Sequence, residues 1–394
     1  MTDLVARTRA FVREVVMPAE PGWGESIASD ALERLRDAAR DAGVYAPHAP
    51  VEYGGLGLPI TQWSRVFQEA GYSPVGAAAL GCMAPDEGNM RLLELVADDD
   101  QKERWLAPLV RGEQRSSFAM TEPHPGAGSD PAALATAARR VDGGWIIEGR
   151  KRFISGAETA DFAIVMARTD EVGGATMLLT RLDAPGITVG PSIRTIESAI
   201  GGGHPYVTFD GCFVPDADVL GEPGAGFRYA QVRLAPARLT HCMRWLGLAR
   251  RAHDTALDRA NGRELFGERL RDLGVAQALI ADSEIDLATS DAMIDAAVAA
   301  VDSGDTRAAS TLSSIAKVHC SEAVFRVIDR AVQLCGGDGV SSGLPLIQFL
   351  NEVRPFRIYD GSSESHRWAI ARRAASARER AVQAGAPRLD VVTP

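Results

Sequence analysis

Two changes in residue pattern divide this chain and constrain its fold more than any other feature. Residues 1 to about 115 place apolar side chains at helical spacing between loops rich in Gly and Pro. From about 116 to 225, short β-rich runs alternate with clusters of Gly, Pro and Asp. Helical spacing then returns and persists to about residue 380. This order predicts an α+β protein in which one helical region precedes a compact sheet and another follows it.

Individual segments support this division. Residues 29–43 carry Ala and Leu side chains on one helical face and end at Gly43, and a later helical stripe runs from Ser321 to Gly336. The β-rich runs are WIIEG (145–149), FAIVMA (162–167), TMLLTR (176–181) and YVTFDGCFV (206–214). Runs of this kind, separated by turn residues, are typical of an antiparallel sheet.

The length of 394 residues exceeds what a single hydrophobic core usually supports. We therefore expect several domains, with boundaries at the two changes of pattern. The expected parts are an N-terminal helical domain (1–115), a middle β domain (116–225) and a C-terminal helical bundle with a frayed tail (226–394).

Composition excludes some classes of function. The formal charge of −10, from 42 basic and 52 acidic residues, argues against non-specific nucleic-acid binding, which depends on Lys and Arg. The N-terminus lacks the apolar core of a signal peptide, and no apolar run approaches the roughly 18 residues of a membrane span. We expect a soluble, cytoplasmic protein.

The cysteines indicate neither a disulfide framework nor a zinc site. They are odd in number, widely spread and never arranged as Cys-x-x-Cys. The five are Cys82, Cys212, Cys242, Cys320 and Cys335. Their pattern fits a reducing compartment, and we expect no metal site.

The segment FAMTEPHPGAGSD (118–130) opens the β region and contains Thr121, two glycines and Ser129. Small residues let a backbone approach a flat or phosphorylated ligand, and hydroxyls can orient that ligand. The same residues also fit an ordinary Gly/Pro turn. The segment therefore indicates a binding loop only in combination with others.

Two further segments have the same ambiguity. Phe153 and Ser155 stand just before a predicted strand, where an aromatic ring and a hydroxyl could contact a planar ligand or simply end the strand. Arg263 precedes Phe266 and Gly267 and could either be solvated or bind a pyrophosphate through its forked guanidinium.

The segment QLCGGDGV (333–340) follows a helix, where paired glycines commonly form a C-cap. No strand precedes it and it lacks the G-x-G-x-x-G pattern, which disfavours a nicotinamide-binding Rossmann enzyme. Asp360 and Gly361 form an Asp-Gly turn before the final helix.

The seven histidines are dispersed along the chain, and no Ser-His-Asp set emerges from the sequence. We interpret His241, His319 and His366 as packing or capping residues.

Five segments occur together in a characteristic order. They are APDEGNM (84–90), MTEP (120–123), ARLTHCMRWLGLARRA (237–252), QLCGG (333–337) and YDGSSESH (359–366). In this order and spacing they resemble the acyl-CoA dehydrogenase family over essentially the whole chain. The subgroup most similar has an aspartate base, and its vertebrate members are often fused to a phosphotransferase-like domain.

The resemblance implies an acyl-CoA dehydrogenase-like fold with an N-terminal α-helical domain, a middle antiparallel β domain and a C-terminal four-helix bundle. It implies FAD as the cofactor, lying between the middle domain and the bundle and completed by a neighbouring subunit. The implied assembly is therefore a homodimer or a homotetramer.

By matched position, four residues of the middle domain face the flavin. Met120 and Thr121 lie at its pyrimidine edge. Phe153 stands where the family usually has Trp at the ring, and Ser155 where it usually has Thr near N5.

Five C-terminal residues match positions that serve the neighbouring subunit's cofactor. Arg263 and Phe266 reach its pyrophosphate, whereas Gln333, Gly336 and Gly337 cradle it. Each implied site therefore needs two chains.

The resemblance makes Asp360 the catalytic base, although Glu is the more familiar residue there. Ser362 and Glu364 stand at positions of further flavin contacts, and Glu364 is the rival candidate for the base.

Ser129, Arg238 and Gly361 match positions that contact the substrate thioester. The loop TEPHPGAGSD is longer than the usual TEPGAGSD, so its alignment at Ser129 is ambiguous. Gly274 also replaces a glutamine that contacts FAD in many members.

The implied reaction is the α,β-dehydrogenation of an acyl-CoA thioester. Asp360 would remove the α-proton while flavin N5 accepts the β-hydride. Hydrogen bonds from the FAD ribityl chain and the Asp360 N–H would stabilise the developing enolate. We expect burial beside the acyl chain to raise the pKa of Asp360. An electron-transfer flavoprotein is the expected type of electron acceptor.

Three alternatives stay open. A flavin oxidase of the same fold, like acyl-CoA oxidase or nitroalkane oxidase, would pass electrons to O₂. A dehydrogenase could instead act on an acyl group bound to a carrier protein. A protein that binds flavin or acyl-CoA without catalysis is the third alternative.

Overall fold

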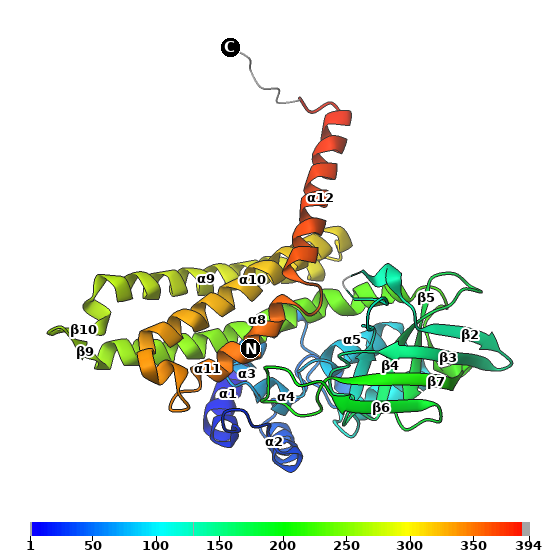
Figure 1. Ribbon diagram of the computed structural model, residues 1–394, viewed down its shortest axis with the longest axis horizontal. Coiled ribbons are helices and arrows are strands. Elements are labelled where there is room, and N and C mark those ends of the chain that lie inside the picture. Colours follow the sequence, from blue (N-terminus) through cyan, green and yellow to red (C-terminus); the bar gives the residue numbers. More distant parts are fainter. Residues whose placement is uncertain (1, 129, 388–394) are drawn as a thin grey trace.

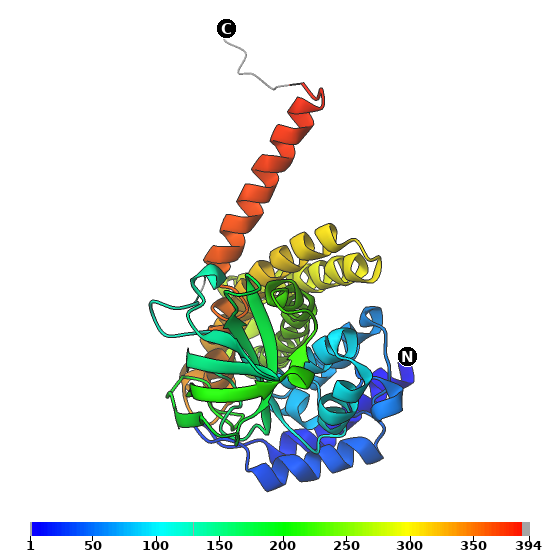
Figure 2. The same cartoon turned by 90° about the vertical axis from the view of Figure 1, so that its right-hand side faces the viewer.

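The computed structural model describes residues 2–128 and 130–387. A group of N-terminal helices lies beside a β-sheet, and both adjoin one end of a set of long C-terminal helices (Figures 1 and 2). The α+β class predicted from the two changes of residue pattern is confirmed.

The N-terminal part is helical, as predicted. Its helices are α1 (Thr2–Phe11), α2 (Ser29–Asp41), α3 (Ile60–Ala70), α4 (Gly76–Ala79), α5 (Asp86–Val96), α6 (Asp99–Gln101) and α7 (Ala107–Val110). Helix α2 buries Leu32, Leu35 and Ala39 along one face, in agreement with the spacing of these residues. The chain leaves the helix at Gly43, whose φ of +64° is readily adopted only by glycine.

The middle part is one sheet with the strand order β6-β7-β3-β2-β4-β5-β8, and β1 also pairs with β4. Its strands are β1 (Ser116–Ala119), β2 (Ala137–Val141), β3 (Gly144–Lys151), β4 (Phe162–Arg168), β5 (Ala175–Arg181), β6 (Ile187–Ser192), β7 (Pro205–Pro215) and β8 (Val219–Leu220). Most pairs are antiparallel, but β1 and β2 each run parallel to β4. Parallel pairing is possible there because neither pair is joined by a hairpin.

Strand β4 connects the sheet to the helices. Its alternate residues Phe162, Ile164 and Met166 belong to the large core that includes the N-terminal and C-terminal helices. Ala163 and Val165 point into a second core inside the β domain. Because both faces of β4 are covered, its sequence is a continuous apolar run and does not alternate with polar residues.

The C-terminal part consists of long helices joined by short connections. Its elements are α8 (Gly226–Gly262), β9 (Glu264–Leu265), β10 (Glu268–Arg269), α9 (Gly274–Asp302), α10 (Thr306–Cys335), α11 (Leu346–Val353) and α12 (Ser363–Gln383). Within the described ranges, no helix combines the length and low polarity needed to cross a membrane.

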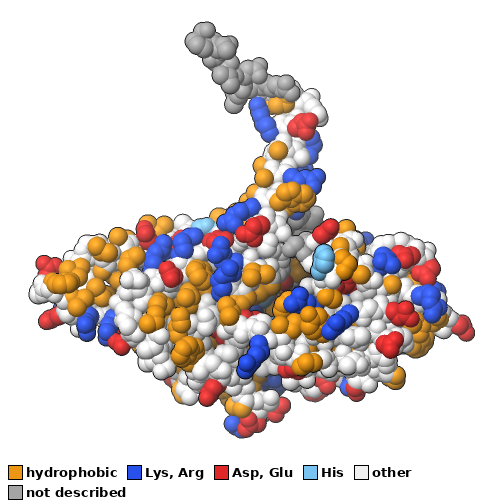
Figure 3. Space-filling model, viewed as in Figure 1, with side chains coloured by type: hydrophobic (Ala, Val, Ile, Leu, Met, Phe, Trp, Pro, Cys, Tyr) orange, Lys and Arg blue, Asp and Glu red, His pale blue; other side chains and the backbone are white. Residues whose placement is uncertain are grey.

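The four-helix arrangement is less regular than the family resemblance implies. Helices α8, α9 and α10 pack against one another along their lengths. Helix α12 instead contacts α10 only over its first part and then extends away from the body as a stalk (Figures 1 and 3). Trp368 on this helix is largely exposed in the single chain.

Candidate active site

The turn between α11 and α12 carries Asp360 in an uncommon backbone conformation. Asp360 has a φ of +55° and the following Gly361 a φ of +92°. A side chain at Gly361 would bring its Cβ to 2.7 Å from His366 Nε2, so glycine is required there. Non-glycine residues in the left-handed region cluster at functional sites, and Asp and Asn tolerate it best.

Basic side chains hold both carbonyl groups of this turn. Arg238 Nε donates to the Asp360 carbonyl oxygen at 3.0 Å, and His366 Nε2 donates to the same oxygen at 3.1 Å. Lys317 Nζ donates to the Gly361 carbonyl oxygen at 2.7 Å. These bonds fix the backbone that presents the Asp360 carboxylate. Arg238, expected at the substrate, contacts the Asp360 turn in the free chain.

The Asp360 carboxylate faces a histidine on α8. His241 Nε2 lies 3.0 Å from Asp360 Oδ2, and only 18% of the Asp360 side chain is exposed. The other ring nitrogen, Nδ1, accepts a hydrogen bond from Arg244. Because a guanidinium can only donate, this bond places the imidazole proton on Nε2, toward Asp360. Our interpretation of His241 as a packing residue was therefore incomplete.

The groups around Asp360 set its pKa in the free chain. Burial raises its pKa, but His241, Arg233 and Arg238 together lower it to well below its usual range. Burial and the neighbouring Arg244 lower the pKa of His241. The expectation of a raised Asp360 pKa concerns the site covered by an acyl chain; in the free chain Asp360 is a carboxylate at neutral pH.

A hydrogen bond connects the segment APDEGNM (84–90) to Arg233, which is also buried near this site. Arg233 Nε donates to Asn89 Oδ1 at 2.7 Å, and Asn89 Nδ2 donates to Ser116 Oγ at 2.8 Å. Ser116 Oγ in turn donates to Asp86 Oδ1 at 2.7 Å, and burial raises the pKa of Asp86 to about 6. The network connects α5, β1 and α8 and fixes a positive charge close to Asp360.

On the middle domain, Thr121 and Phe153 lie side by side. The Arg152 N–H donates to the Thr121 carbonyl oxygen at 2.8 Å. Phe153 has a φ of +56° and is 42% exposed, while Met120 is partly buried. An exposed aromatic ring in this conformation, next to an exposed hydroxyl, provides a surface on which a planar ligand can lie.

A buried ion pair fixes the loop that carries these residues. Lys151 Nζ lies 2.9 Å from Glu122 Oε1, with side chains 0% and 1% exposed. Lys151 also donates to the Met120 carbonyl oxygen at 3.1 Å. Glu122 accepts the backbone N–H groups of Ala135 and Thr136. The loop conformation is therefore set by a carboxylate with several donors around it.

Ser155 takes part in a contact that the sequence did not reveal. Its Oγ lies 2.9 Å from His204 Nδ1, and His204 Nε2 lies 3.0 Å from Glu197 Oε1. The sequence indicated no Ser-His-Asp set, and the acidic residue of this contact is a glutamate. The three residues are far apart in sequence, so spacing gave no signal.

The residues expected at a neighbour's cofactor lie at the opposite end of the helices. The hairpin β9–β10 and the end of α10 are remote from the sheet (Figure 1), and Arg259 pairs with Asp338 there at 2.7 Å. All five of these residues are exposed: Arg263, Phe266, Gln333, Gly336 and Gly337. Phe266 is 96% exposed and has a φ of +55°. A single chain therefore does not bring them to its own middle domain.

Ser362 and Glu364 have local roles in the chain as described. Ser362 Oγ accepts the Ser365 N–H at 3.2 Å and caps α12. Glu364 is exposed and lies 4.0 Å from Arg367. Ser129 lies outside the described residues.

The structure adds several charged residues near Asp360: Arg233, His241, Arg244 and Lys317. One signal in the sequence could have indicated part of this set. Arg238, His241 and Arg244 are spaced by three residues and therefore lie on one side of α8. Charged residues repeated on the buried side of a helix seldom serve packing alone.

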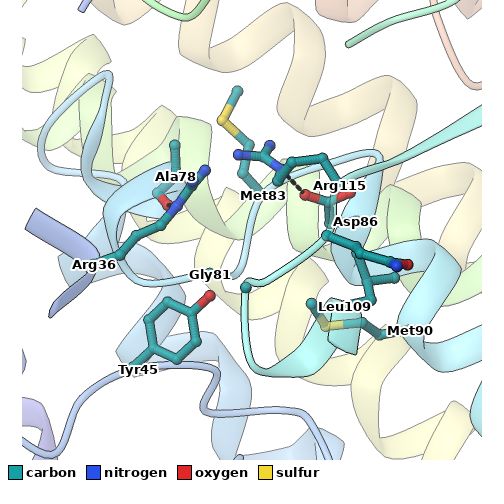
Figure 4. A pocket seen from close by; sticks show the side chains of 11 residues that line it. Arg36, Tyr45, Ala78, Gly81, Met83, Asp86, Met90, Leu109 and Arg115 are labelled. Carbon is teal, nitrogen blue, oxygen red and sulfur yellow. Dashed lines mark hydrogen bonds and ion pairs between the residues drawn. The ribbon is translucent and has the colours of Figure 1, made fainter. Parts of the chain in front are cut away.

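The cavities found elsewhere do not include Asp360. The one in Figure 4 measures about 10 Å³ and lies between Tyr45 and the Arg115–Asp86 ion pair. It has room for no more than a water molecule. A cleft of about 430 Å³ between α1, α3, α8 and α9 is lined by paired charges such as Arg65 and Asp291.

The exposed residues fit FAD. A flavin ring can lie against Phe153 with Thr121 and Ser155 at its edge, because this surface is open and offers hydroxyl groups. At the far end of the helices, a Cβ built on Gly336 or Gly337 meets no atom within 4 Å. That open backbone, beside an arginine, suits the pyrophosphate of another chain.

Three family models of the acyl-CoA dehydrogenases match this chain in succession. The N-terminal domain model matches residues 2–113, the middle domain model residues 117–212, and the C-terminal domain model residues 224–375. Together they cover most of the sequence.

Individual relatives carry names from the same family. "Probable acyl-CoA dehydrogenase FadE2" of Mycobacterium tuberculosis is 34% identical, and the match covers 98% of this chain and 97% of that protein. Acyl-CoA dehydrogenase family member 10 of Mus musculus is 33% identical over 96% of this chain. This chain spans only 37% of that mouse protein and about half of the matched family member 11 proteins.

Solved structures show the same fold. A structure from Mycobacterium abscessus, described as an acyl-CoA dehydrogenase, has a TM-score of 0.88 and 32% identity, covering 96% of this chain and 98% of that one. Butyryl-CoA dehydrogenase of Megasphaera elsdenii has a TM-score of 0.82 at 24% identity, covering 95% and 97%. Glutaryl-CoA dehydrogenase of Mycobacterium smegmatis, in complex with FADH2, has a TM-score of 0.82 at 23% identity, covering 95% and 94%.

The three matched domain models and the relative of 34% identity place the chain among FAD-dependent oxidoreductases. The chain belongs to the acyl-CoA dehydrogenase family.

Proposed function

We propose that this enzyme dehydrogenates an acyl-CoA thioester between Cα and Cβ, with Asp360 as the base. The observation that carries this proposal is the Asp360 carboxylate itself. It is shielded from solvent, faces His241 at 3.0 Å and sits on a turn whose carbonyl groups are held by basic side chains. A carboxylate fixed in this way is suited to remove a proton from a substrate placed beside it.

The same turn can stabilise the negative charge that develops on the thioester oxygen. Within the described residues, the Asp360 N–H meets no hydrogen-bond acceptor. Since the Asp360 carbonyl is held by Arg238 and His366, the orientation of the neighbouring peptide groups is fixed. A donor that is already oriented stabilises a developing oxyanion without reorganisation. When bound, FAD supplies the acceptor for the β-hydride.

The lowered pKa of Asp360 belongs to the chain without substrate. An acyl chain that covers the carboxylate would exclude water and raise the pKa of Asp360 toward that of a more effective base. His241, Arg233 and Arg238 then act as positioning residues that keep the base ionised until substrate arrives. An electron-transfer flavoprotein is the proposed electron acceptor.

Anaerobic titration with acyl-CoAs of graded chain length tests the function. We expect a yellow protein that releases FAD on denaturation and whose flavin absorbance bleaches on addition of a substrate acyl-CoA. Full activity in flavin-free protein would contradict the proposal. Bleaching followed by rapid H₂O₂ formation in air would indicate an oxidase. Bleaching only by a carrier-protein thioester would change the substrate class, and binding without bleaching would indicate a non-catalytic protein.

We further propose that each site is completed by a second chain, in a homodimer or homotetramer. The exposed Arg263 and Phe266 of one chain would contact the FAD held mainly by its neighbour. Arg263→Ala is then expected to weaken both FAD retention and the oligomer, because it removes a guanidinium from the pyrophosphate. Gel filtration and the ratio of bound FAD to protein measure the two effects.

Arg139→Ala is the matched control for this variant. Arg139 is also exposed, but it lies on β2 in the middle domain. We expect it to change neither FAD content nor oligomeric state. The shared site would be contradicted if either the wild-type protein or the Arg263→Ala variant were a monomer that keeps its full FAD content.

A further inference from the structure

A second polar array lies on the surface that fits the flavin. Ser155 Oγ is 2.9 Å from His204 Nδ1, and His204 Nε2 is 3.0 Å from Glu197 Oε1. The histidine thus connects the hydroxyl to the carboxylate through its two ring nitrogens. An imidazole in this position can accept a proton on one side while releasing one on the other.

The backbone around this array is fixed. The Gly156 N–H donates to the Gly203 carbonyl oxygen at 2.9 Å, and the His204 N–H donates to Ser192 Oγ at 3.0 Å. Gly203 has a φ of +54°, and a Cβ there would overlap Ser192 Oγ at 1.6 Å. Glycine is therefore required beside His204, which keeps the imidazole facing Ser155.

The array is also partly exposed to solvent. The side chains of His204 and Glu197 are 26% and 24% exposed. Glu197 Oε2 is buried and has no hydrogen-bond partner among the described residues. Burial raises the pKa of Glu197, but the hydrogen bond with His204 and further donors lower it below its usual value. Glu197 therefore remains a carboxylate that can take a proton.

We propose that Ser155, His204 and Glu197 form a proton relay that serves reoxidation of the reduced cofactor. This inference rests on the proposed function, because it requires Ser155 to lie at flavin N5. Asp360 is not part of this relay, because it is proposed to act on the substrate in the step that reduces the flavin.

The relay balances protons and electrons in the following way. Bound FAD, once reduced, would supply two electrons to two equivalents of a one-electron acceptor protein and one proton at N5. Ser155 Oγ accepts the proton released at N5, and its own hydroxyl proton passes to His204 Nδ1. His204 Nε2 passes a proton to Glu197, from which it reaches water. Each bond broken to hydrogen is thus matched by one formed.

Two substitutions separate proton transfer from hydrogen bonding. His204→Asn keeps a polar group near the place of Nδ1 but cannot carry a proton from one side to the other. Glu197→Gln keeps an oxygen that accepts a hydrogen bond from Nε2 but is not basic. We expect both to slow reoxidation by the acceptor protein about 10²-fold, the lower end for a lost acid–base group. Reduction by acyl-CoA should stay within about twofold of wild type, because neither side chain transfers a proton in that step.

The holoenzyme can be reduced with dithionite as well as with acyl-CoA. Failure of acyl-CoA to bleach the flavin would defeat the proposed function, yet reoxidation after dithionite would still test the relay. Wild-type reoxidation rates in both His204→Asn and Glu197→Gln would overturn it.

Nitrogen NMR of holoenzyme containing ¹⁵N-histidine gives a readout that does not depend on activity. The relay predicts that the His204 ring-nitrogen shifts differ between oxidised and reduced holoenzyme and that Ser155→Ala abolishes the difference. His319→Asn is the control, because His319 lies on α10 and contacts Thr289 of α9 at 3.1 Å, outside the array. His204 shifts that are independent of redox state would overturn the relay.

The same residue types could instead hydrolyse a thioester, with Ser155 as nucleophile. Release of free CoA without flavin reduction, lost in Ser155→Ala, would show that activity and replace the relay.

Discussion

Asp360→Asn is expected to slow reduction of the flavin by acyl-CoA at least about 10²-fold, the low end for loss of a positioned base. The fold, FAD content and substrate affinity should be retained. Asn has nearly the same volume as Asp and tolerates the φ of +55° found at this position. Anaerobic stopped-flow absorbance with a substrate acyl-CoA measures the rate.

Glu364→Gln is the matched control, since Glu364 is the nearby carboxylate and lies exposed at the start of α12. We expect near-normal flavin reduction in this variant. Near-normal reduction in Asp360→Asn together with an inactive Glu364→Gln would transfer the role of the base to Glu364. Asp360→Glu should keep partial activity, because the carboxylate survives but moves by one methylene.

The pH dependence should follow the lowered pKa of Asp360 in the free enzyme. A base with a lowered pKa stays ionised as the pH falls. The rate of flavin reduction at subsaturating acyl-CoA, which reports the free enzyme, should therefore not decrease near pH 5 to 6. His241→Phe removes the group that faces Asp360 Oδ2 and should move an acid limb upward in pH. An unchanged profile in this variant would argue against His241 as a positioning residue.

Lys151→Met is expected to cause the largest loss of stability, about 3–5 kcal/mol in the free energy of unfolding of the middle domain. The substitution removes the cation from a pair whose side chains are 0% and 1% exposed and leaves Glu122 buried without it. Since Lys151 also holds the Met120 carbonyl, FAD content should fall as well. Chemical denaturation followed by circular dichroism measures the change.

Lys102→Met provides the comparison. Lys102 pairs with Asp99 at 4.0 Å at the surface, where ion pairs contribute less than about 1 kcal/mol. The double variant Lys151→Met with Glu122→Gln should recover part of the stability, because no unpaired charge then remains buried. Equal stability of Lys151→Met and Lys102→Met would show that the pair does not hold the domain together.

Most of the fold could be predicted from the sequence. Apolar runs predicted β3, β4, β5 and β7, and helical spacing with glycine stops predicted α2 and the end of α10. The direction of α12 could not be predicted, because most side chains of this helix are exposed and no burial pattern fixes how it packs. The parallel pairing of β1 with β4 was also missed, since strand order depends on contacts between distant segments.

Only part of the candidate site could be predicted from the sequence. The family resemblance pointed to Asp360, but its pKa depends on groups more than a hundred residues away, such as His241 and Arg238. In the free chain, Arg233, Arg238 and His241 lower the pKa of Asp360 in spite of its burial. In the same way, Ser155 and His204 are 49 residues apart in sequence and meet only when the sheet forms.

The β9–β10 hairpin has a further consequence. It carries Arg263 and Phe266 at the end of the bundle that is remote from the sheet (Figure 1). If these residues serve a neighbour as proposed, affinity for the cofactor would obey mass action between chains as well as between protein and FAD. Dilution would then separate the chains and release flavin together, and the fraction of active sites would depend on protein concentration.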